Sequence, residues 1–465
     1  PVIRFDRHTG QAQDVSPLPV QTFGSEINQR KLRATWTSPI VISPRDPKTV
    51  YFGAQYLLRS SHRGMNWQQI SPDLTGADPQ APPSGLPTIE NAKAHGYGAI
   101  YTVAPSPLDS NVIWTGSDSG LIYLTRDGGK TWNNVTPPGL SDWSKISLID
   151  AGHFNAGTAY VAVDRHRLDD MSPWAYRTHD SGKTWTKIVD GLAPNAFVRA
   201  VREDPKRKGL LFAGTEFGVY VSNDDGKQWT SLQLNLPVAP IHDLVIKNDD
   251  LIVATHGRSF WVLDDISPLR ELTANFGNVP AYVFKPARTF RVRRSVNNDT
   301  PLPPEEPQGE NAPAGAIVYY DLDGRTSGKV KLEVLDKSGQ IVRRYSSNDK
   351  PPVPRTPPPF PDYWLPKTEI LSSEPGMHRL VWDLRYTPPP ASGGSYSMAV
   401  ANLQTEPLPQ GPLVVPGAYR VRLTVAGKTY EQPLEVTPDP RVKTTPQEFA
   451  QQFALAKRIY DGVVL

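Results

Sequence analysis

The chain has 465 residues, which is enough for two or three domains that each bury a core. Its 50 basic and 47 acidic side chains leave a formal net charge of +3 without a basic block, which argues against a nucleic-acid partner. The sequence holds no cysteine and no apolar run of transmembrane length, so disulfides, thiolate metal sites and a helical membrane span are excluded. Its 48 prolines and 35 glycines separate short apolar runs, a pattern typical of a turn-rich β protein.

Residues 1–17 predict two strands joined at a His-Thr-Gly-Gln turn, which we interpret as the outer half of a four-stranded unit. The sequence starts without a Met or a signal peptide, and we therefore interpret it as a piece of a longer protein. Downstream, a short apolar strand, a turn with Pro or Asp, and a second apolar strand recur along the chain. Inner strands are expected near 36–43, 98–104, 145–150, 197–203 and 241–246.

The first four of these units each carry a copy of the pattern S/T-x-D-x-G-x-T-W or a degenerate form of it. The copies are TRDGGKTW, THDSGKTW, SNDDGKQW and the degenerate SSHRGMNW. A loop that recurs this often is an architectural element, so we predict a hairpin turn between the third and fourth strands. The carboxylate would accept hydrogen bonds from turn amides, and the Trp would cover the sheet. The structural residues expected in these boxes are Asp127, Trp132, Asp180, Trp185, Asp224 and Trp229.

The box spacing of about 45–65 residues matches one blade of a β-propeller, and residues 1–265 are assigned to that domain. At least five blades are expected, as part of a larger ring. The boxes resemble the Asp-box (BNR) repeats of sialidases, sortilin-type receptors and related propellers. The stretches REDPKRKGLLFAGTEFGVYVSNDDGKQW and IHDLVIKNDDLIVATHGRSFWVLDD are similar to large bacterial sortilin-like proteins often labelled glycosyl hydrolases.

The composition changes after the propeller. Residues 266–311 are predicted to be a linker, and 312–440 an immunoglobulin-like β-sandwich with a Pro-rich insertion at 348–375. The stretches GMHRLVWDLR and VPGAYRVRLTVAGK resemble the immunoglobulin-like domain of flagellar hook-capping proteins. A C-terminal helix is expected within 441–465, with Thr445 as its N-cap and Pro446 at its first position. The fold class is therefore all-β, with one short helix.

Function in a propeller usually belongs to the central channel and to the loops of one face. Glu216 and Asp243 are the weak catalytic candidates, and we expect Arg258 to form an ion pair with one of them, which is a structural role. The loop at 80–98 is long enough to be a recognition element. The candidate ligand-binding residues are Glu90, His95, Tyr97, Arg202, His242, His256 and Arg258. No metal site and no cofactor is predicted, because the nine histidines are scattered.

Two functions remain open at this point. The first is a non-catalytic binding or assembly module of a bacterial extracytoplasmic protein, which recognises a protein or peptide, possibly a glycan. The alternative is a glycoside hydrolase, sialidase-like or otherwise exo-acting, that uses channel carboxylates. A sialidase needs three arginines around the substrate carboxylate, and Arg33, Arg199, Arg202 and Arg258 lie on or near inner strands. The sequence carries no sialidase arginine motif ahead of its boxes.

Overall fold

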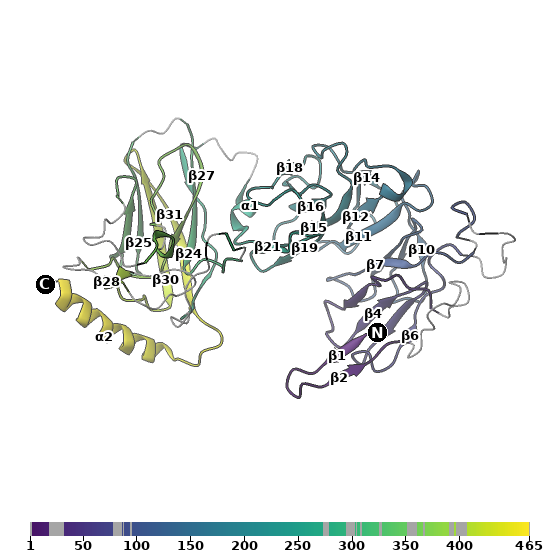
Figure 1. The fold of residues 1–465 in the computed structure, drawn as a ribbon, viewed down its shortest axis with the longest axis horizontal. Coiled ribbons are helices and arrows are strands. Elements are labelled where there is room, and N and C mark those ends of the chain that lie inside the picture. The colour runs from purple at the N-terminus through teal and green to yellow at the C-terminus, as the bar shows by residue number, and fades with distance from the viewer. Residues whose placement is uncertain are drawn as a thin grey trace. The chain divides into compact units, whose positions relative to one another are not determined.

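The computed structural model consists almost entirely of β-strands (Figure 1). It describes residues 2–17, 32–77, 86, 88–93, 95–272, 279–293, 303, 305–306, 309–324, 328–350, 360–365, 368–389, 395–396 and 407–464. The chain divides into two compact units, Pro1–Leu263 and Asp264–Leu465. No helix in the described part of the chain is long and apolar enough to cross a membrane.

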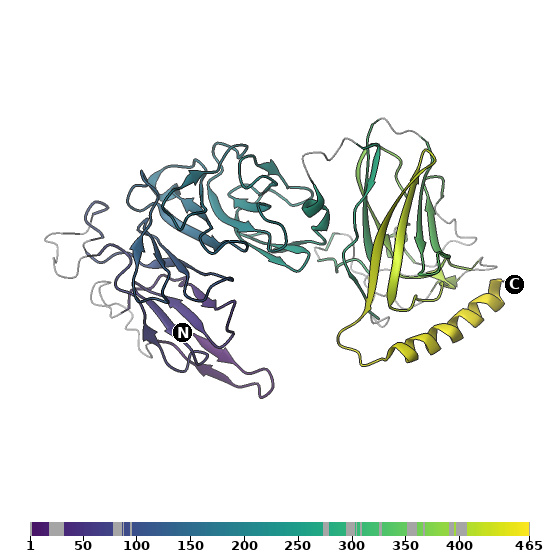
Figure 2. The same ribbon diagram turned by 180° about the vertical axis from the view of Figure 1, so that it is seen from behind.

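The first unit is a series of antiparallel sheets in which consecutive strands are neighbours, as in the blades of a propeller. The sheets follow one another around an arc (Figures 1 and 2).

The strands of the five blades have the following bounds. Blade 1 is β3 (Ile40–Ile42), β4 (Val50–Gly53), β5 (Leu57–Ser60) and β6 (Gln68–Gln69). Blade 2 is β7 (Ile100–Pro105), β8 (Ile113–Ser117), β9 (Ile122–Thr125) and β10 (Asn133–Asn134). Blade 3 is β11 (Lys145–Ala151), β12 (Ala159–Asp164), β13 (Trp174–Thr178) and β14 (Thr186–Lys187). Blade 4 is β15 (Val198–Glu203), β16 (Leu211–Thr215), β17 (Val219–Ser222) and β18 (Thr230–Ser231), and blade 5 is β19 (Ile241–Lys247), β20 (Asp250–Thr255) and β21 (Phe260–Leu263).

Five blades were expected and are present, but the fifth differs from the predicted four strands. In the described residues it has three strands, because β21 is followed by the short helix α1 (Ser267–Glu271) instead of a box and a fourth strand. Another short helix, the 3-10 helix η2 (His166–Leu168), lies between β12 and β13.

The boxes form hydrogen-bonded turns that tie each blade to the one before it. In blade 2 the Asp127 carboxylate accepts bonds from the amides of Lys130 and Thr131, at 3.0 and 2.9 Å. Gly129 has φ +99°, which a residue with a Cβ rarely adopts. The Trp132 indole donates to the carbonyl of Ile70 in blade 1, at 2.9 Å.

The same indole bond repeats at the next two joints, as Trp185 to Val135 at 2.7 Å and Trp229 to Ile188 at 3.0 Å. In the degenerate box, Trp67 donates to the carbonyl of Val15 at 2.7 Å. Val15 follows β2 (Ala12–Asp14), which pairs with β1 (Ile3–Phe5). The hairpin β1–β2 therefore occupies the place of the outer two strands of a blade, as the sequence predicts.

The inner halves of the blades approach closely where the second strand carries glycine. A Cβ added to Gly116 would lie 2.4 Å from Ile146 Cγ2, and one added to Gly214 would lie 2.7 Å from Ile241 Cγ2. Blade 3 has Ala162 at this position, packed in one cluster with Val198 of blade 4. The sequence thus fits small residues on one blade to branched residues on the next.

The second unit is a β-sandwich with one shared core. One sheet has the order β22 (Ala281–Val283), β24 (Ala316–Leu322) and β27 (Gly376–Trp382). The other has the order β23 (Thr289–Arg291), β31 (Lys428–Pro438), β30 (Gly417–Val425), β25 (Val330–Leu335) and β26 (Ile341–Ser346). Both sheets contribute to a single buried cluster that includes Tyr320, Trp382, Leu332 and Leu423. Smaller elements are β28 (Ser395–Tyr396), paired with β29 (Pro407–Leu408), and the 3-10 helix η3 (Asp362–Trp364).

The prediction of a linker at 266–311 is wrong for part of that range. Strand β22 pairs with β24, and β23 pairs in parallel with β31, so residues 281–291 belong to the sandwich. Of the Pro-rich insertion, residues 351–359 and 366–367 lie outside the described residues.

Helix α2 (Pro446–Val464) begins at Pro446 after the N-cap Thr445, as the sequence predicts, and this cap is reciprocal. The Thr445 hydroxyl accepts from the amide of Glu448 at 3.3 Å, and the Glu448 carboxylate accepts from the amide of Thr445 at 2.7 Å. The helix is attached to the sandwich through its first half, where Arg291 bonds Gln452 at 2.9 Å and Phe453 packs on Tyr386.

Candidate functional site

The inner strands of blades 2 to 5 share a β-bulge at the same position. The pairing with the second strand skips one residue between Ile100 and Thr102, and skips again at the equivalent place in the next three blades. The residues skipped are Tyr101, Ser147, Arg199 and His242. Because a bulge re-aims the side chain of the extra residue, these four form one equivalent set around the inner strands.

A second equivalent set lies where the second strands end, beside the starts of the inner strands. The backbone amide of Asp118 donates to the Ala99 carbonyl, and that of Glu216 donates to the Phe197 carbonyl. Ala99 and Phe197 are the residues directly before the inner strands β7 and β15. His256 does the same with Pro240, and Asp164 pairs with Lys145. This set is therefore Asp118, Asp164, Glu216 and His256 in blades 2 to 5. We call the two sets together the inner rim.

Carboxylates of the second set are held by cations in blades 3 and 4. Arg199 donates to the Glu216 carboxylate from Nε at 3.1 Å and from Nη2 at 2.7 Å. Lys145 Nζ lies 2.8 Å from one oxygen of the buried Asp164, and His166 Nδ1 lies 2.5 Å from the other. These pairs hold two of the three rim carboxylates in contact with cations.

Aromatic rings lie among these charges. Lys145 Nζ lies 4.7 Å from the centre of the Tyr101 ring, and the Arg199 guanidinium lies 4.7 Å from that of Phe197. In blade 5, the rings of His242 and His256 meet edge to face with centroids 4.9 Å apart. The rim thus combines aromatic faces with hydrogen-bond donors and acceptors, which is the chemistry of a polar ligand site.

The third rim carboxylate differs from the other two. Burial raises the pKa of Asp118, while its bond from the Ala99 amide lowers that pKa in part. Burial would also raise the pKa of Asp164, but Lys145 and His166 reverse the shift and hold that pKa below its usual value. The pKa values of two equivalent carboxyls in adjacent blades, Asp118 and Asp164, are therefore shifted in opposite directions by their surroundings.

The imidazole of His242 is driven toward its neutral form. Burial lowers its pKa, and the neighbouring charges of Arg199 and His256 lower that pKa further, against the opposing effect of Glu216. The rim therefore offers one imidazole that is neutral near neutral pH and able to accept a hydrogen bond.

The predicted ion pairs of Arg258 are wrong. The partner of Glu216 is Arg199, and the partner of Asp243 is Arg202 at 2.9 Å. Arg258 and His256 do not lie on one regular strand, because β20 ends at Thr255 and Gly257 turns the chain with φ +84°.

Arg202 is a bridge between blades. It contacts Asp150 at 3.1 Å and Asp243 at 2.9 Å, and its Nε donates to the Leu244 carbonyl. Arg33 is likewise paired, with Asp73 at 2.6 Å. Each of these arginines, like Arg199, has its own carboxylate, so the structure does not gather them around a place for a substrate carboxylate as a sialidase requires.

The described part of the loop at 80–98 packs on a neighbouring loop. Trp143 donates to the Ile89 carbonyl at 2.8 Å, and Lys93 pairs with Asp142. Within the loop, the amides of His95 and Tyr97 donate to carbonyls of the same loop. Glu90 is exposed, and hydrogen bonding by Thr88 lowers its pKa. Residues 80–85, 87 and 94 of this predicted element lie outside the described residues.

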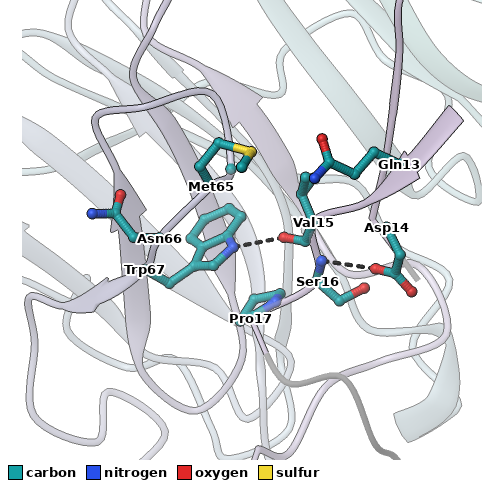
Figure 3. Close-up of a pocket in the computed structure, with 9 residues that line it drawn as sticks. Gln13, Asp14, Val15, Ser16, Pro17, Met65, Asn66 and Trp67 are labelled. Atoms are coloured by element: carbon teal, nitrogen blue, oxygen red, sulfur yellow. Dashed lines mark hydrogen bonds between the residues drawn. The ribbon is translucent and has the colours of Figure 1, made fainter. Parts of the chain in front are cut away.

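A pocket of about 260 Å³ lies away from the rim, between the hairpin β1–β2 and the degenerate box (Figure 3). Trp67 and Met65 face Val15 and Pro17 across it, and the Trp67 indole bonds the Val15 carbonyl. This is the joint between the outer strands and blade 1, so we assign the pocket to packing. Among the described residues, no group of His, Asp or Glu has the geometry to hold a metal ion.

Sequence reasoning missed Asp118 and Asp164 as rim residues. A signal for Asp118 was present, because GSDSG aligns with GTEFG and places Asp118 level with Glu216. The bulges left no such signal. A bulge shifts the alternation of side chains by one residue, so regular alternation assigns the side chains beyond it to the wrong face of the sheet.

No family model matches the chain. It is 27% identical over 104 residues to an oligoxyloglucan-reducing end-specific xyloglucanase of Emericella nidulans. This alignment covers 22% of this chain and 13% of the relative. It is 25% identical over 197 residues to a probable enzyme of the same name from Neosartorya fischeri, which covers 39% of this chain and 21% of the relative. The GH74 xyloglucanase of Xanthomonas campestris aligns with 19% identity over 55% of this chain and 39% of its own, with a TM-score of 0.38. At that TM-score the structural likeness carries no argument about function. The chain thus spans a small part of the curated relatives that it matches.

Proposed function

We propose that the inner rim is a glycan-binding surface and that the chain is part of an extracytoplasmic, glycoside hydrolase-related propeller protein. The observation that carries the proposal is the repeated bulge, which places Tyr101, Arg199 and His242 at equivalent positions of the rim. Arg199 there holds Glu216, Tyr101 lies against Lys145, and His242 meets His256. The two curated relatives are both named as xyloglucanases, which supports a neutral polysaccharide as the ligand class. The expected protein or peptide partner has no comparable support.

The rim chemistry suits sugar hydroxyls. The Glu216 carboxylate is held by Arg199 and keeps lone pairs for hydroxyl donors, and the exposed Phe217 follows it in sequence. The Arg199 guanidinium that holds Glu216 also lies over the Phe197 ring, so aromatic and polar groups stand close together at this part of the rim, as a sugar ring with an apolar face and a polar edge requires.

Hydrolysis requires one carboxyl that is protonated and one that is ionised. Asp118 is our candidate for the proton donor, because burial raises its pKa, whereas Lys145 and His166 hold the pKa of the equivalent Asp164 below its usual value. Glu216 is the candidate for the ionised carboxylate, because of its contact with Arg199. The resemblance of the boxes to Asp-box repeats belongs to the same proposal and is supported by the Asp127 and Trp132 hydrogen bonds.

Binding is tested by calorimetric titration of the chain with xyloglucan oligosaccharides, beside the variants Glu216→Gln and Arg199→Met. Each variant removes one partner of a charged pair and should weaken binding by about tenfold or more. The matched control is Glu431→Gln, which removes the partner of Arg420 in the sandwich and should leave binding unchanged. Unchanged affinity in both rim variants would contradict the proposal.

Catalysis is tested separately, by reducing-end release from the same oligosaccharides. Asp118→Asn should abolish release while the affinity stays within about threefold, because the amide keeps the size of the carboxyl but cannot donate a proton in the same way. Release that survives this substitution would exclude Asp118 as the acid.

A further inference from the structure

A buried hydroxyl in the joint between blades 3 and 4 lies against two carboxyl groups. The Tyr160 hydroxyl, on β12, is 3.2 Å from Glu203 Oε1 and 2.7 Å from Asp225 Oδ1 in the box of blade 4. Tyr160 is 0% exposed and Glu203 is 2% exposed. The inner strand β15 starts at the inner rim and ends at Glu203, so this cluster lies at the other end of the joint.

The equivalent positions of the two preceding joints carry no carboxyl group. They are Tyr51, Pro105 and Gly128 between blades 1 and 2, and Trp114, Ala151 and Ser181 between blades 2 and 3. A joint of this propeller therefore closes with aromatic, apolar and small residues here, whereas buried carboxyls cost free energy of desolvation. Packing alone does not explain Glu203 and Asp225.

The hydrogen bonds of the cluster require one extra proton. A tyrosine hydroxyl has a single hydrogen, so Tyr160 can donate to only one of its two carboxyl neighbours. Asp225 Oδ2 lies 3.2 Å from the Arg177 guanidinium and 2.8 Å from His179 Nε2, which favours its ionised form. No ion pair among the described residues includes Glu203. The second hydrogen therefore belongs on Glu203, which donates it to the Tyr160 oxygen.

The surroundings of Glu203 agree with this assignment. Burial raises the pKa of Glu203, and the amides of His153 and Gly209, which donate to its oxygens, oppose the shift only in part. The nearest charged groups on the blade 3 side form a set of their own. Asp150 accepts the Glu203 amide at 2.8 Å, is paired with Arg202 at 3.1 Å and lies 3.9 Å from His153 Nε2.

We propose that Glu203, Tyr160 and Asp225 form a proton-dependent lock between blades 3 and 4. While Glu203 is protonated, it donates to Tyr160 and Tyr160 donates to Asp225, so one chain of hydrogen bonds crosses the joint. When Glu203 loses its proton, two carboxylates compete for one hydroxyl hydrogen and repel each other, and the box of blade 4 loosens from blade 3.

The direction of the pH dependence follows from the protonated form. A carboxyl that keeps its proton more strongly in the folded protein stabilises the joint below its unfolded value near 4.5, and that contribution is lost as the pH rises. At its rim end the same joint carries the rings of His166 and Phe197, stacked with centroids 5.2 Å apart. The lock is independent of what the inner rim binds.

Hydrogen exchange of the full chain, read by mass spectrometry, tests the lock. Protection of the blade 4 box (222–229) is divided by that of the blade 2 box (125–132) in the same sample, which removes the intrinsic effect of pH on exchange. In the wild type this ratio should fall several-fold from about pH 5 to about pH 9. In Glu203→Gln it should stay constant, because the neutral amide donates to Tyr160 at every pH.

The matched control is Glu90→Gln, which removes an exposed carboxylate of the same unit and should follow the wild type. Tyr160→Phe is a second variant, in case Glu203→Gln fails to fold by circular dichroism. It should give, at the acid end, the low ratio that the wild type has at the alkaline end. A wild-type ratio that does not change with pH overturns the proposal, as does an equal change in Glu203→Gln or full protection in Tyr160→Phe.

Discussion

At the residue scale, the indole of each box joins two blades through its ring and through its N–H. Trp229 is buried and donates to the Ile188 carbonyl of the preceding blade. We expect Trp229→Ala to lower the free energy of unfolding of the propeller by about 3–5 kcal/mol. Trp229→Phe keeps one aromatic ring and should therefore destabilise the propeller less than the Ala variant does. It loses the packing of the second ring and one hydrogen bond, which is worth about 1 kcal/mol. Urea denaturation measures both, and a cost below about 1 kcal/mol for the Ala variant would contradict a structural role for the box.

Box carboxylates also carry a pH dependence of stability. In Asp180, the side-chain hydrogen bond from Thr184 and then its backbone amide lower the pKa from 3.8 to about 2. A pKa that is lower in the folded state stabilises the fold above the unfolded value near 3.8, and that contribution is lost as the pH falls through about 2. Asp180→Asn should therefore lower stability at pH 5 and lower it less at pH 2, as urea midpoints at the two pH values would show. An equal loss at both would mean that the carboxylate charge is not involved.

At the scale of elements, the approach of neighbouring blades depends on pairs of residues that match in size. A Cβ at position 214 would lie 2.7 Å from Ile241 Cγ2, so Gly214→Ala should destabilise the joint by about 1–3 kcal/mol. Adding Ile241→Val recreates the Ala162–Val198 combination that blade 3 and blade 4 already use. The double variant should then lose less than the sum of the single variants. Strict additivity in urea denaturation would show that the two positions do not share one contact.

Strands and turns were predictable because their signals are local. The inner strands of the blades appear where alternation and turn residues placed them, and the main strands of the sandwich fall within the predicted range 312–440. The errors arose where contacts between residues far apart in the sequence determine the structure. Residues 281–291 read as a linker because β22 and β23 have only three residues each, and their partners β24 and β31 lie far along the sequence. Likewise, the Arg199–Glu216 pair was missed because a bulge, which alternation does not reveal, places Arg199.

At the scale of the whole molecule, the chain contains two units with separate cores. The sandwich cluster contains Leu332 and Leu423, while Leu211 belongs to a cluster of blades 3 and 4. A unit with its own core unfolds as its own cooperative transition. We expect differential scanning calorimetry to resolve two transitions. Leu423→Ala, which truncates a fully buried side chain, should lower the midpoint of one transition, and Leu211→Ala should lower that of the other. Were either variant to move both midpoints equally, the two units would have to unfold as one, and the separate cores would not be independent sources of stability.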